Sequence, residues 1–180
     1  MMYVFIGCSS KDNLDKIYRD SAIEIANYLS LHHYKLMCGG VTGIMKTVQE
    51  VFKANKQEVT IVGVKGYHDN EVRKLKNAYL CDSIKERKNM FIKKADLILI
   101  LPGGIGTIDE LFTVIESKRA KEHNIPIIIA NINQYYTHLI KQLNTIYQEG
   151  FGDENEINYN IANSSSEVIQ YIEQLGGNNE

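Results

Sequence analysis

The stretch ADLILILPGGIGTIDE, residues 95–110, decides how this chain folds and where it binds a ligand. Its aliphatic segment, Asp96–Leu101, is typical of a buried strand and leads into Pro-Gly-Gly-x-Gly-Thr and then a predicted helix, Thr107–His123. Glycines expose backbone N–H groups, and the first turn of a helix adds unpaired donors and the positive end of the helix dipole. The stretch therefore predicts a strand–turn–helix unit that binds an anion, most often a phosphate.

Strand-like and helix-like segments alternate along the rest of the chain. Strands are expected at Tyr3–Gly7, Tyr34–Cys38, Val59–Val64, Asp96–Leu101 and Ile125–Ala130, and a short edge strand at Ile157–Ile161. Helices are expected at Leu14–His32, Ile44–Lys53, Ser83–Lys94, Thr107–His123, Tyr136–Gln148 and Ser164–Leu175, the last with a Ser164/Glu167 capping box. Residues 65–83 have no firm period and are expected to form a loop or a short helix.

Such alternation with short connections predicts an α/β, Rossmann-like three-layer fold, with a mainly parallel sheet and helices on both faces. We expect a single domain over residues 1–175 and a frayed tail over 176–180.

Glycine-rich segments also follow the first two expected strands. Gly39 and Gly40 come after Tyr34–Cys38, and Ser9 lies just beyond Tyr3–Gly7. Because ligands of parallel α/β sheets bind outside the carboxyl ends of the strands, we expect these residues to share one site with the anion-binding loop. That loop comprises Gly103, Gly104, Gly106 and Thr107. The ordinary alternatives are that the glycines only close turns and that Ser9 and Ser10 cap the next helix.

Thr107 and Glu110 have the spacing of a capping box, which satisfies two backbone donors and needs no ligand. A cap explains neither the proline nor the three glycines that precede it. We therefore interpret Glu110 as the functional acid and Asp109 as its neighbour beside the substrate. Asp109 also suits the first turn of a helix, where the dipole favours an acid.

The run Glu86–Met90 supplies a second set of polar candidates. In a helix, Arg87 falls near Ile84 and Phe91 on the apolar side, where a guanidinium needs an acceptor such as a substrate phosphate or carboxylate. The alternative is a solvated basic helix face. Lys88 lies on the other flank of that stripe, where binding, solvent exposure and partner contact stay equally open.

Composition excludes several classes of protein. The 180 residues carry a net charge of −2 from 20 basic and 22 acidic residues, interleaved along the chain, which gives no footprint for nucleic acid or a membrane surface. The N-terminus has no basic segment of a signal peptide, and three widely spaced cysteines fit a reducing compartment, so we expect a cytoplasmic protein. The five histidines lack metal-ligand spacing, and we expect no metal and no other cofactor.

Other chemistry is poorly supported by the sequence. Neither the Gly-x-Gly-x-x-Gly dinucleotide fingerprint after the first strand nor the Gly-x-x-x-x-Gly-Lys-Ser/Thr loop occurs in the sequence. Cys8 and Cys38 are expected to be small buried hydrophobes, because no histidine is placed by sequence to activate them as nucleophiles. The eleven tyrosines are expected on helix faces and at subunit contacts.

Two central motifs resemble those of a known family. Glu86-Arg87-Lys88-x-Met90 and the Pro102–Glu110 segment are similar to motifs of the LOG ("Lonely Guy") cytokinin riboside 5′-monophosphate phosphoribohydrolases, many once labelled possible lysine decarboxylases. The likeness runs from Cys8-Ser9-Ser10 through Gly39-Gly40-x-x-Gly43-Ile44-Met45 to about Phe151. It departs from the family at Lys46, at Lys65 and at Ile84.

The resemblance implies a Rossmann-like homodimer with its site near the subunit boundary. It also implies cleavage of the N-glycosidic bond of AMP or a cytokinin nucleotide, giving free base and ribose 5-phosphate. The family's catalytic arginine and glutamate fall on Arg87 and Glu110, and its phosphate loop falls on Gly103–Thr107. The competing functions are a nucleotide-binding or carrier protein without catalysis and an enzyme similar to nucleoside deoxyribosyltransferases.

Overall fold

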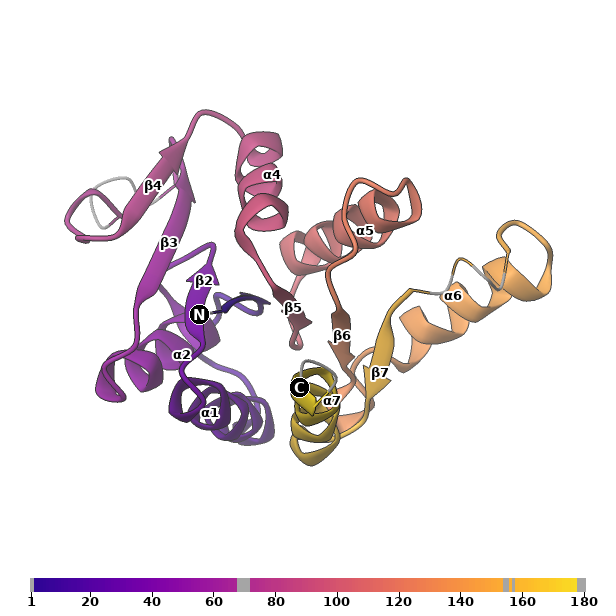
Figure 1. Cartoon of the computed structure of the whole chain (residues 1–180), viewed down its shortest axis with the longest axis horizontal. Coiled ribbons are helices and arrows are strands. Elements are labelled where there is room, and N and C mark those ends of the chain that lie inside the picture. The colour runs from indigo at the N-terminus through magenta and orange to yellow at the C-terminus, as the bar shows by residue number, and fades with distance from the viewer. Residues whose placement is uncertain (1, 68–71, 154–155, 157, 178–180) are drawn as a thin grey trace.

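A computed structural model describes residues 2–67, 72–153, 156 and 158–177 of the chain. Within these residues, one seven-stranded sheet has the order β4-β3-β2-β1-β5-β6-β7, and every neighbouring pair is parallel (Figure 1). The strands are β1 (Tyr3–Gly7), β2 (Lys35–Cys38), β3 (Val59–Val64), β4 (Ala78–Cys81), β5 (Leu97–Ile100), β6 (Ile127–Ala130) and β7 (Asn160–Ala162).

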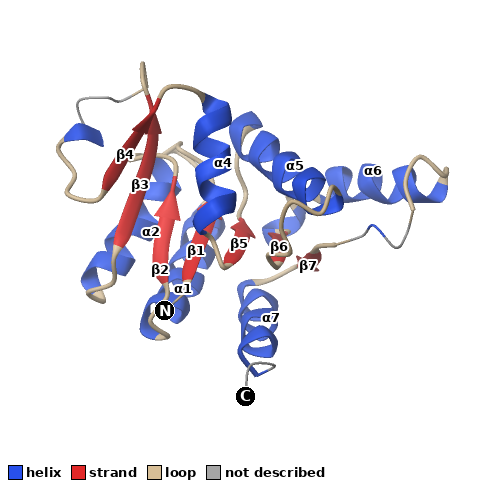
Figure 2. Cartoon of the chain, turned by 45° about the horizontal axis from the view of Figure 1, so that its top comes forward, coloured by secondary structure: helices blue, strands red, loops and turns tan. Residues whose placement is uncertain are grey.

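Helices cover both faces of this sheet, as Figures 1 and 2 show. They are α1 (Lys16–Leu31), α2 (Gly43–Ala54), α4 (Ile84–Lys94), α5 (Ile105–Arg119), α6 (Thr137–Gln148) and α7 (Ser165–Gly177), with a 3-10 turn η1 (Ile132–Gln134). Helices α1, α2 and α7 pack into one hydrophobic core, and α4, α5 and α6 pack into the other. Strand β5 shows why two cores form, because Leu97 and Leu99 point into the first and Ile98 and Ile100 into the second.

The order of the strands creates the position of a ligand site. The chain runs outward from β1 through β2, β3 and β4, then returns to place β5 on the other side of β1. The connections that leave β1 and β5 therefore diverge at the carboxyl end of the sheet. Such a switch point is where open α/β sheets bind their ligands.

The predicted fold is confirmed, and most element positions agree with the structure to within a few residues. The expectation for residues 65–83 is wrong in part, because Ala78–Cys81 form strand β4. This strand lies at the edge of the sheet, with Tyr79 exposed and Ala78 and Leu80 only partly covered, and it lacks the β-branched residues that mark strands such as β3 and β5 in the sequence.

Several element ends also differ from the prediction. Helix α5 begins at Ile105 rather than Thr107, because Gly104 is its N-cap. Strand β7 is shifted toward the C-terminus of the expected edge strand, of which residue 157 lies outside the described residues. Helix α7 has the predicted capping bond, with the Glu167 N–H donating to Ser164 Oγ at 3.2 Å. It continues to Gly177, two residues beyond the predicted helix end at Leu175, and residues 178–180 of the expected frayed tail lie outside the described residues.

None of the described helices combines the length and apolar character needed to cross a bilayer.

We expect Leu99→Ala to lower the free energy of unfolding by about 2–5 kcal/mol, because it leaves a cavity beneath a fully covered central strand. Leu31→Ala is the matched control, since Leu31 at the end of α1 is 64% exposed, and it should change stability by less than about 0.5 kcal/mol. Urea unfolding measures both variants. Equal effects would contradict the assignment of Leu99 to the core.

Candidate functional site

A cavity of about 630 Å³ opens at the switch point of the sheet. The segments that follow β1, β2 and β5 supply most of its wall, namely Cys8–Lys11, Gly39–Thr42 and Pro102–Thr107. Helix α4 adds Ile84 and Arg87. The convergence of glycine turns expected from the sequence is therefore present in the structure, and it encloses a space of the size that small-molecule ligands occupy.

Nine of the eleven predicted site residues line this cavity: Ser9, Gly39, Gly40, Arg87, Gly103, Gly104, Gly106, Thr107 and Glu110. Lys88 and Asp109 do not line it, and they bind each other instead. The Lys88 Nζ lies 2.8 and 2.9 Å from the two carboxylate oxygens of Asp109. These two residues therefore flank the site on its outer side, where each neutralises the charge of the other.

The loop that the sequence predicts to bind an anion presents a row of free backbone donors. No hydrogen bond to the N–H groups of Gly103–Thr107 occurs within the described part of the chain, and the first bonded amide of α5 is that of Ile108, which donates to the Gly104 carbonyl at 3.1 Å. A Cβ added to Gly104 or Gly106 would meet nothing within 4 Å. Packing therefore does not require glycine at these two positions, whereas a ligand approaching the helix start does benefit from their missing side chains.

Thr107 does not cap the helix, so the capping-box alternative for Thr107 and Glu110 is wrong. Thr107 lies inside the first turn of α5, and its buried hydroxyl donates to the Cys8 carbonyl at 3.2 Å. A hydroxyl has one proton to donate, so this bond leaves Thr107 with its backbone N–H as the donor for an anion. Its side chain instead ties the start of α5 to the end of β1.

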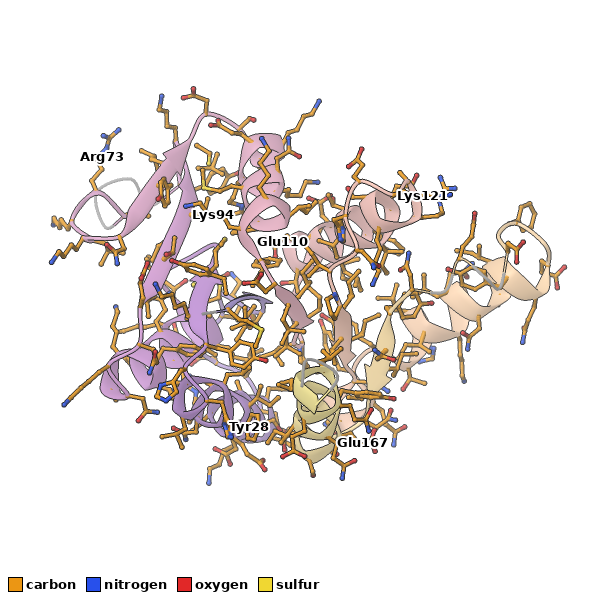
Figure 3. The ribbon with its side chains drawn as sticks, in the orientation of Figure 1. Tyr28, Arg73, Lys94, Glu110, Lys121 and Glu167 are labelled. Carbon is orange, nitrogen blue, oxygen red and sulfur yellow. The ribbon has the colours of Figure 1, made fainter. Side chains whose placement is uncertain are left out.

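Arg87 and Glu110 form an ion pair across the cavity wall between α4 and α5, with Nη2 3.0 Å from Oε1. Figure 3 shows Glu110 near the centre of the molecule, between these two helices. The side chains are only 19% and 9% exposed. Arg87 also donates from Nη1 to the Gly39 carbonyl at 3.4 Å and lies over the Phe91 ring at 5.8 Å.

Two glycines at strand ends make room for this pair. A Cβ on Gly7 would lie 3.1 Å from Glu110 Oε2 and 3.0 Å from the side chain of Ile100. A Cβ on Gly39 would lie 3.3 Å from Arg87 Nη1. The glycine that ends β1 and the glycine that follows β2 therefore allow the side chains of Glu110 and Arg87 to pack closely.

The surroundings of Glu110 change its acidity. The pKa of Glu110 is raised from 4.5 to about 7, and burial is the main cause. The charge of Arg87 opposes this rise, that of Asp109 adds to it, and that of Lys88 opposes it. The pair Lys88–Asp109 thus acts on Glu110 from outside the cavity. A carboxyl group whose pKa lies near neutrality, beside an open anion site, is a recurrent feature of catalytic centres.

The cysteines and metal candidates add no further chemistry. Burial raises the pKa of the Cys38 thiol to about 12 and that of Cys8 well above its usual value, so both are thiols at neutral pH. Their expected role as buried hydrophobes is confirmed. Among the described residues, no group of three or more His, Cys, Asp or Glu side chains could hold a metal ion.

Sequence reasoning missed five polar side chains that line the cavity: Lys11, Tyr18, Thr42, Tyr67 and Tyr135. Tyr135 packs edge-on against Tyr18, with ring centroids 5.8 Å apart, and its hydroxyl donates to the Gly103 carbonyl at 2.7 Å. The expected role of the tyrosines on helix faces is therefore wrong for Tyr135. Its position after β6, next to β5 in the sheet, is the signal that could have placed it at this edge.

The fold and this geometry define an α/β protein whose switch point holds a helix start with unpaired backbone N–H groups beside a buried acid. The sequence matches the family described as "Possible lysine decarboxylase" over residues 39–173. It is 28% identical over 151 residues to the probable cytokinin riboside 5′-monophosphate phosphoribohydrolase LOGL2 of Oryza sativa subsp. japonica, covering 82% of this chain. It is 26% identical over 181 residues to the phosphoribohydrolase LOG4 of Arabidopsis thaliana, covering 95% of this chain and 81% of that protein. The match spans 62% of the length of LOGL2.

Solved structures share the fold at lower identity. The molybdenum cofactor carrier protein of Chlamydomonas reinhardtii superposes with a TM-score of 0.67 at 15% identity, covering 98% of each chain. DNA processing protein A of Helicobacter pylori gives a TM-score of 0.62 at 13% identity, covering 96% of this chain and 80% of that chain. The chain belongs to the possible lysine decarboxylase family, which is the LOG family, and the resemblance seen in its motifs is confirmed.

We expect Gly103→Ala to lower the melting temperature, because a Cβ at Gly103 would overlap the side chain of Thr107. Such overpacking costs roughly 1–3 kcal/mol. Gly104→Ala is the control in the adjacent position, where a Cβ meets no atom within 4 Å, and it should leave the melting temperature unchanged. Equal melting temperatures for the two variants would show that the loop is looser than the structure describes.

Proposed function

We propose that this protein is a hydrolase that cleaves the N-glycosidic bond of a nucleoside 5′-monophosphate, such as AMP or a cytokinin riboside monophosphate, to free base and ribose 5-phosphate. The observation that carries the proposal is one cavity holding both a row of unpaired backbone donors and the buried Arg87–Glu110 pair. Membership of the LOG family and the printed activity of the plant relatives support it.

The phosphate end of the substrate fits the start of α5. The free N–H groups of Gly103–Thr107 and the helix dipole there favour a dianion. Lys11 adds a cation at the same cavity. This arrangement supports a requirement for the 5′-phosphate, which distinguishes the proposed hydrolase from an enzyme that acts on unphosphorylated nucleosides.

The sugar end fits the Glu110 carboxylate. Departure of a purine leaves an oxocarbenium-like ribose, and a nearby negative charge stabilises it most where water is excluded. Glu110 supplies that charge from a side chain that is 9% exposed. Arg87 holds the carboxylate in place and offers its remaining N–H groups to the substrate or to the departing base.

A carrier without catalysis is the second candidate. The molybdenum cofactor carrier of Chlamydomonas reinhardtii shares this fold, and a helix start that holds phosphate suits passive binding equally well. The raised pKa of Glu110 favours the hydrolase, because a carrier gains nothing from burying a carboxyl group in its ligand cavity. Incubation of the wild-type protein with AMP, with detection of free adenine, separates the two functions.

The proposal includes a cytoplasmic homodimer, as the family resemblance implies. Ile105, which is 83% exposed at the start of α5, and Ile84, which is 46% exposed on the cavity wall, support an interface near the site. Light scattering of the purified protein measures the oligomeric state.

We expect Glu110→Gln to lower kcat for base release by about 100- to 1,000-fold, as loss of one transition-state stabilising group does. AMP binding should be retained, because the phosphate donors are untouched. Glu116→Gln, on the exposed face of the same helix, is the control and should keep full activity. Full activity of Glu110→Gln would refute the assignment.

The pH profile provides an independent test. If the ionised carboxylate is the active form, kcat/KM should rise with pH through an inflection near the Glu110 pKa of about 7. Asp109→Asn should move the inflection to lower pH and Lys88→Gln to higher pH, because the first removes a negative and the second a positive charge near Glu110. Shifts in the opposite directions would contradict this role.

The raised pKa of Glu110 also predicts how the stability of the protein depends on pH. Because folding raises the Glu110 pKa, the folded protein binds the proton more tightly, and this contribution to stability is present below pH 4.5 and lost as pH rises through about 7. The free energy of unfolding of the wild type relative to Glu110→Gln should therefore fall between these pH values. A difference that does not vary with pH would show that the carboxyl group keeps its ordinary pKa.

A further inference from the structure

Every carbonyl group of the loop that leads into α5 already has a donor. The Leu101 carbonyl accepts from the Tyr136 hydroxyl at 2.9 Å, and the Gly103 carbonyl accepts from the Tyr135 hydroxyl at 2.7 Å. Between them, the Pro102 carbonyl accepts from the Ser9 N–H at 3.2 Å, and the Gly104 carbonyl accepts from Ile108. The loop thus turns its acceptors into the protein, while the N–H groups of Gly103–Thr107 bond to no group in the described part of the chain.

Because the peptide bond is planar, the paired carbonyls of the loop and its unpaired N–H groups are linked. In a trans peptide the carbonyl of one residue and the N–H of the next point in opposite directions. A donor that holds the Gly103 carbonyl therefore also fixes the direction of the Gly104 N–H. This peptide joins two glycines, whose backbone rotates with little steric restraint, so it is the one in the loop that most needs an external anchor.

The segment that precedes Tyr135 and Tyr136 has an unusual backbone conformation. Asn133 and Gln134 both adopt left-handed conformations, with φ of 52° and 58°, which residues other than glycine adopt at a cost. The buried Asn131 holds the segment in place, because its Oδ1 accepts from the Tyr136 N–H at 2.7 Å. Backbone strain of this kind persists where the surrounding contacts require one geometry. In this segment, that geometry places the Tyr135 hydroxyl within hydrogen-bond distance of the Gly103 carbonyl.

We propose that Tyr135 is a positioning residue for phosphate binding, whose hydroxyl prevents the Gly103–Gly104 peptide from flipping. A flip would turn the Gly103 carbonyl, an acceptor with a partial negative charge, toward the anion and withdraw the Gly104 N–H. The inference rests on the proposed function in taking the ligand of the loop to be a phosphate. Tyr136 serves as the internal comparison, because the peptide it anchors is Leu101–Pro102, which has no N–H to direct.

The experiment measures binding of inorganic phosphate, AMP and adenosine by calorimetry. Tyr135→Phe, Tyr136→Phe and the control Tyr79→Phe are each placed in a Glu110→Gln background, so that no nucleotide is consumed. Tyr79 is 43% exposed, close to the 44% of Tyr135, and its hydroxyl accepts from Lys94 Nζ at 3.0 Å outside the cavity lining. The control therefore removes one tyrosine hydroxyl bond from a similarly exposed side chain.

We expect Tyr135→Phe to weaken phosphate and AMP binding by about three- to tenfold, the effect of one net hydrogen bond, and to leave adenosine binding unchanged. Tyr136→Phe should lower the melting temperature, because it leaves a buried carbonyl unpaired, and change phosphate affinity less. Tyr79→Phe should change neither. With Glu110 intact, Tyr135→Phe should raise KM for AMP while kcat is kept.

Unchanged phosphate affinity in Tyr135→Phe overturns the inference. Equal losses for AMP and adenosine, or no phosphate binding to the parent protein, overturn it as well. The proposed hydrolase activity fails separately, through absence of base release by the wild type. A phosphate-specific effect of Tyr135→Phe in a protein that releases no base would therefore support the inference and refute the hydrolase.

Discussion

The burial of one carboxylate is the constraint on which the rest of the site depends. Glu110 comes from the first turns of a helix and reaches a place that is almost closed to water, where an isolated charge would be costly. Arg87 offsets that cost from the neighbouring helix, and Gly7 and Gly39 give the two side chains room to meet. The pairing of α4 with α5, and the small residues at the ends of β1 and β2, all follow from the need to hold this acid in place.

A related requirement applies to the loop after β5, which we propose binds a phosphate. A row of unpaired amides attracts phosphate only if no carbonyl competes with it, and the loop after β5 meets this condition by giving each carbonyl a donor. Those donors come from the segment after β1, from α5 itself and from the segment after β6. Elements far apart in the sequence thus orient a single short loop, and this is why the site lies at the switch point, where they converge.

Much of this organisation is readable from the sequence. The aliphatic runs and the glycine turns behind them predicted the parallel sheet, its two helical layers and nine of the residues that line the cavity, because period and turn chemistry are local properties. The prediction missed β4, whose short, half-exposed sequence carries little periodic signal at the edge of the sheet. It also misplaced the start of α5, because Thr107 and Glu110 have the spacing of a cap while Gly104 takes that position.

By itself, the sequence determined which residue types follow each strand, and therefore that glycine turns and an acid would meet at one edge of the sheet. Only the tertiary structure decided what each of these side chains does. It bonded Thr107 to Cys8, paired Lys88 with Asp109 outside the cavity, and brought Tyr135 to the Gly103 carbonyl. The physical reason is that hydrogen bonds and ion pairs act over about 3 Å, between groups 21 to 99 residues apart in the chain. Local sequence patterns carry no record of which distant group will arrive within that distance.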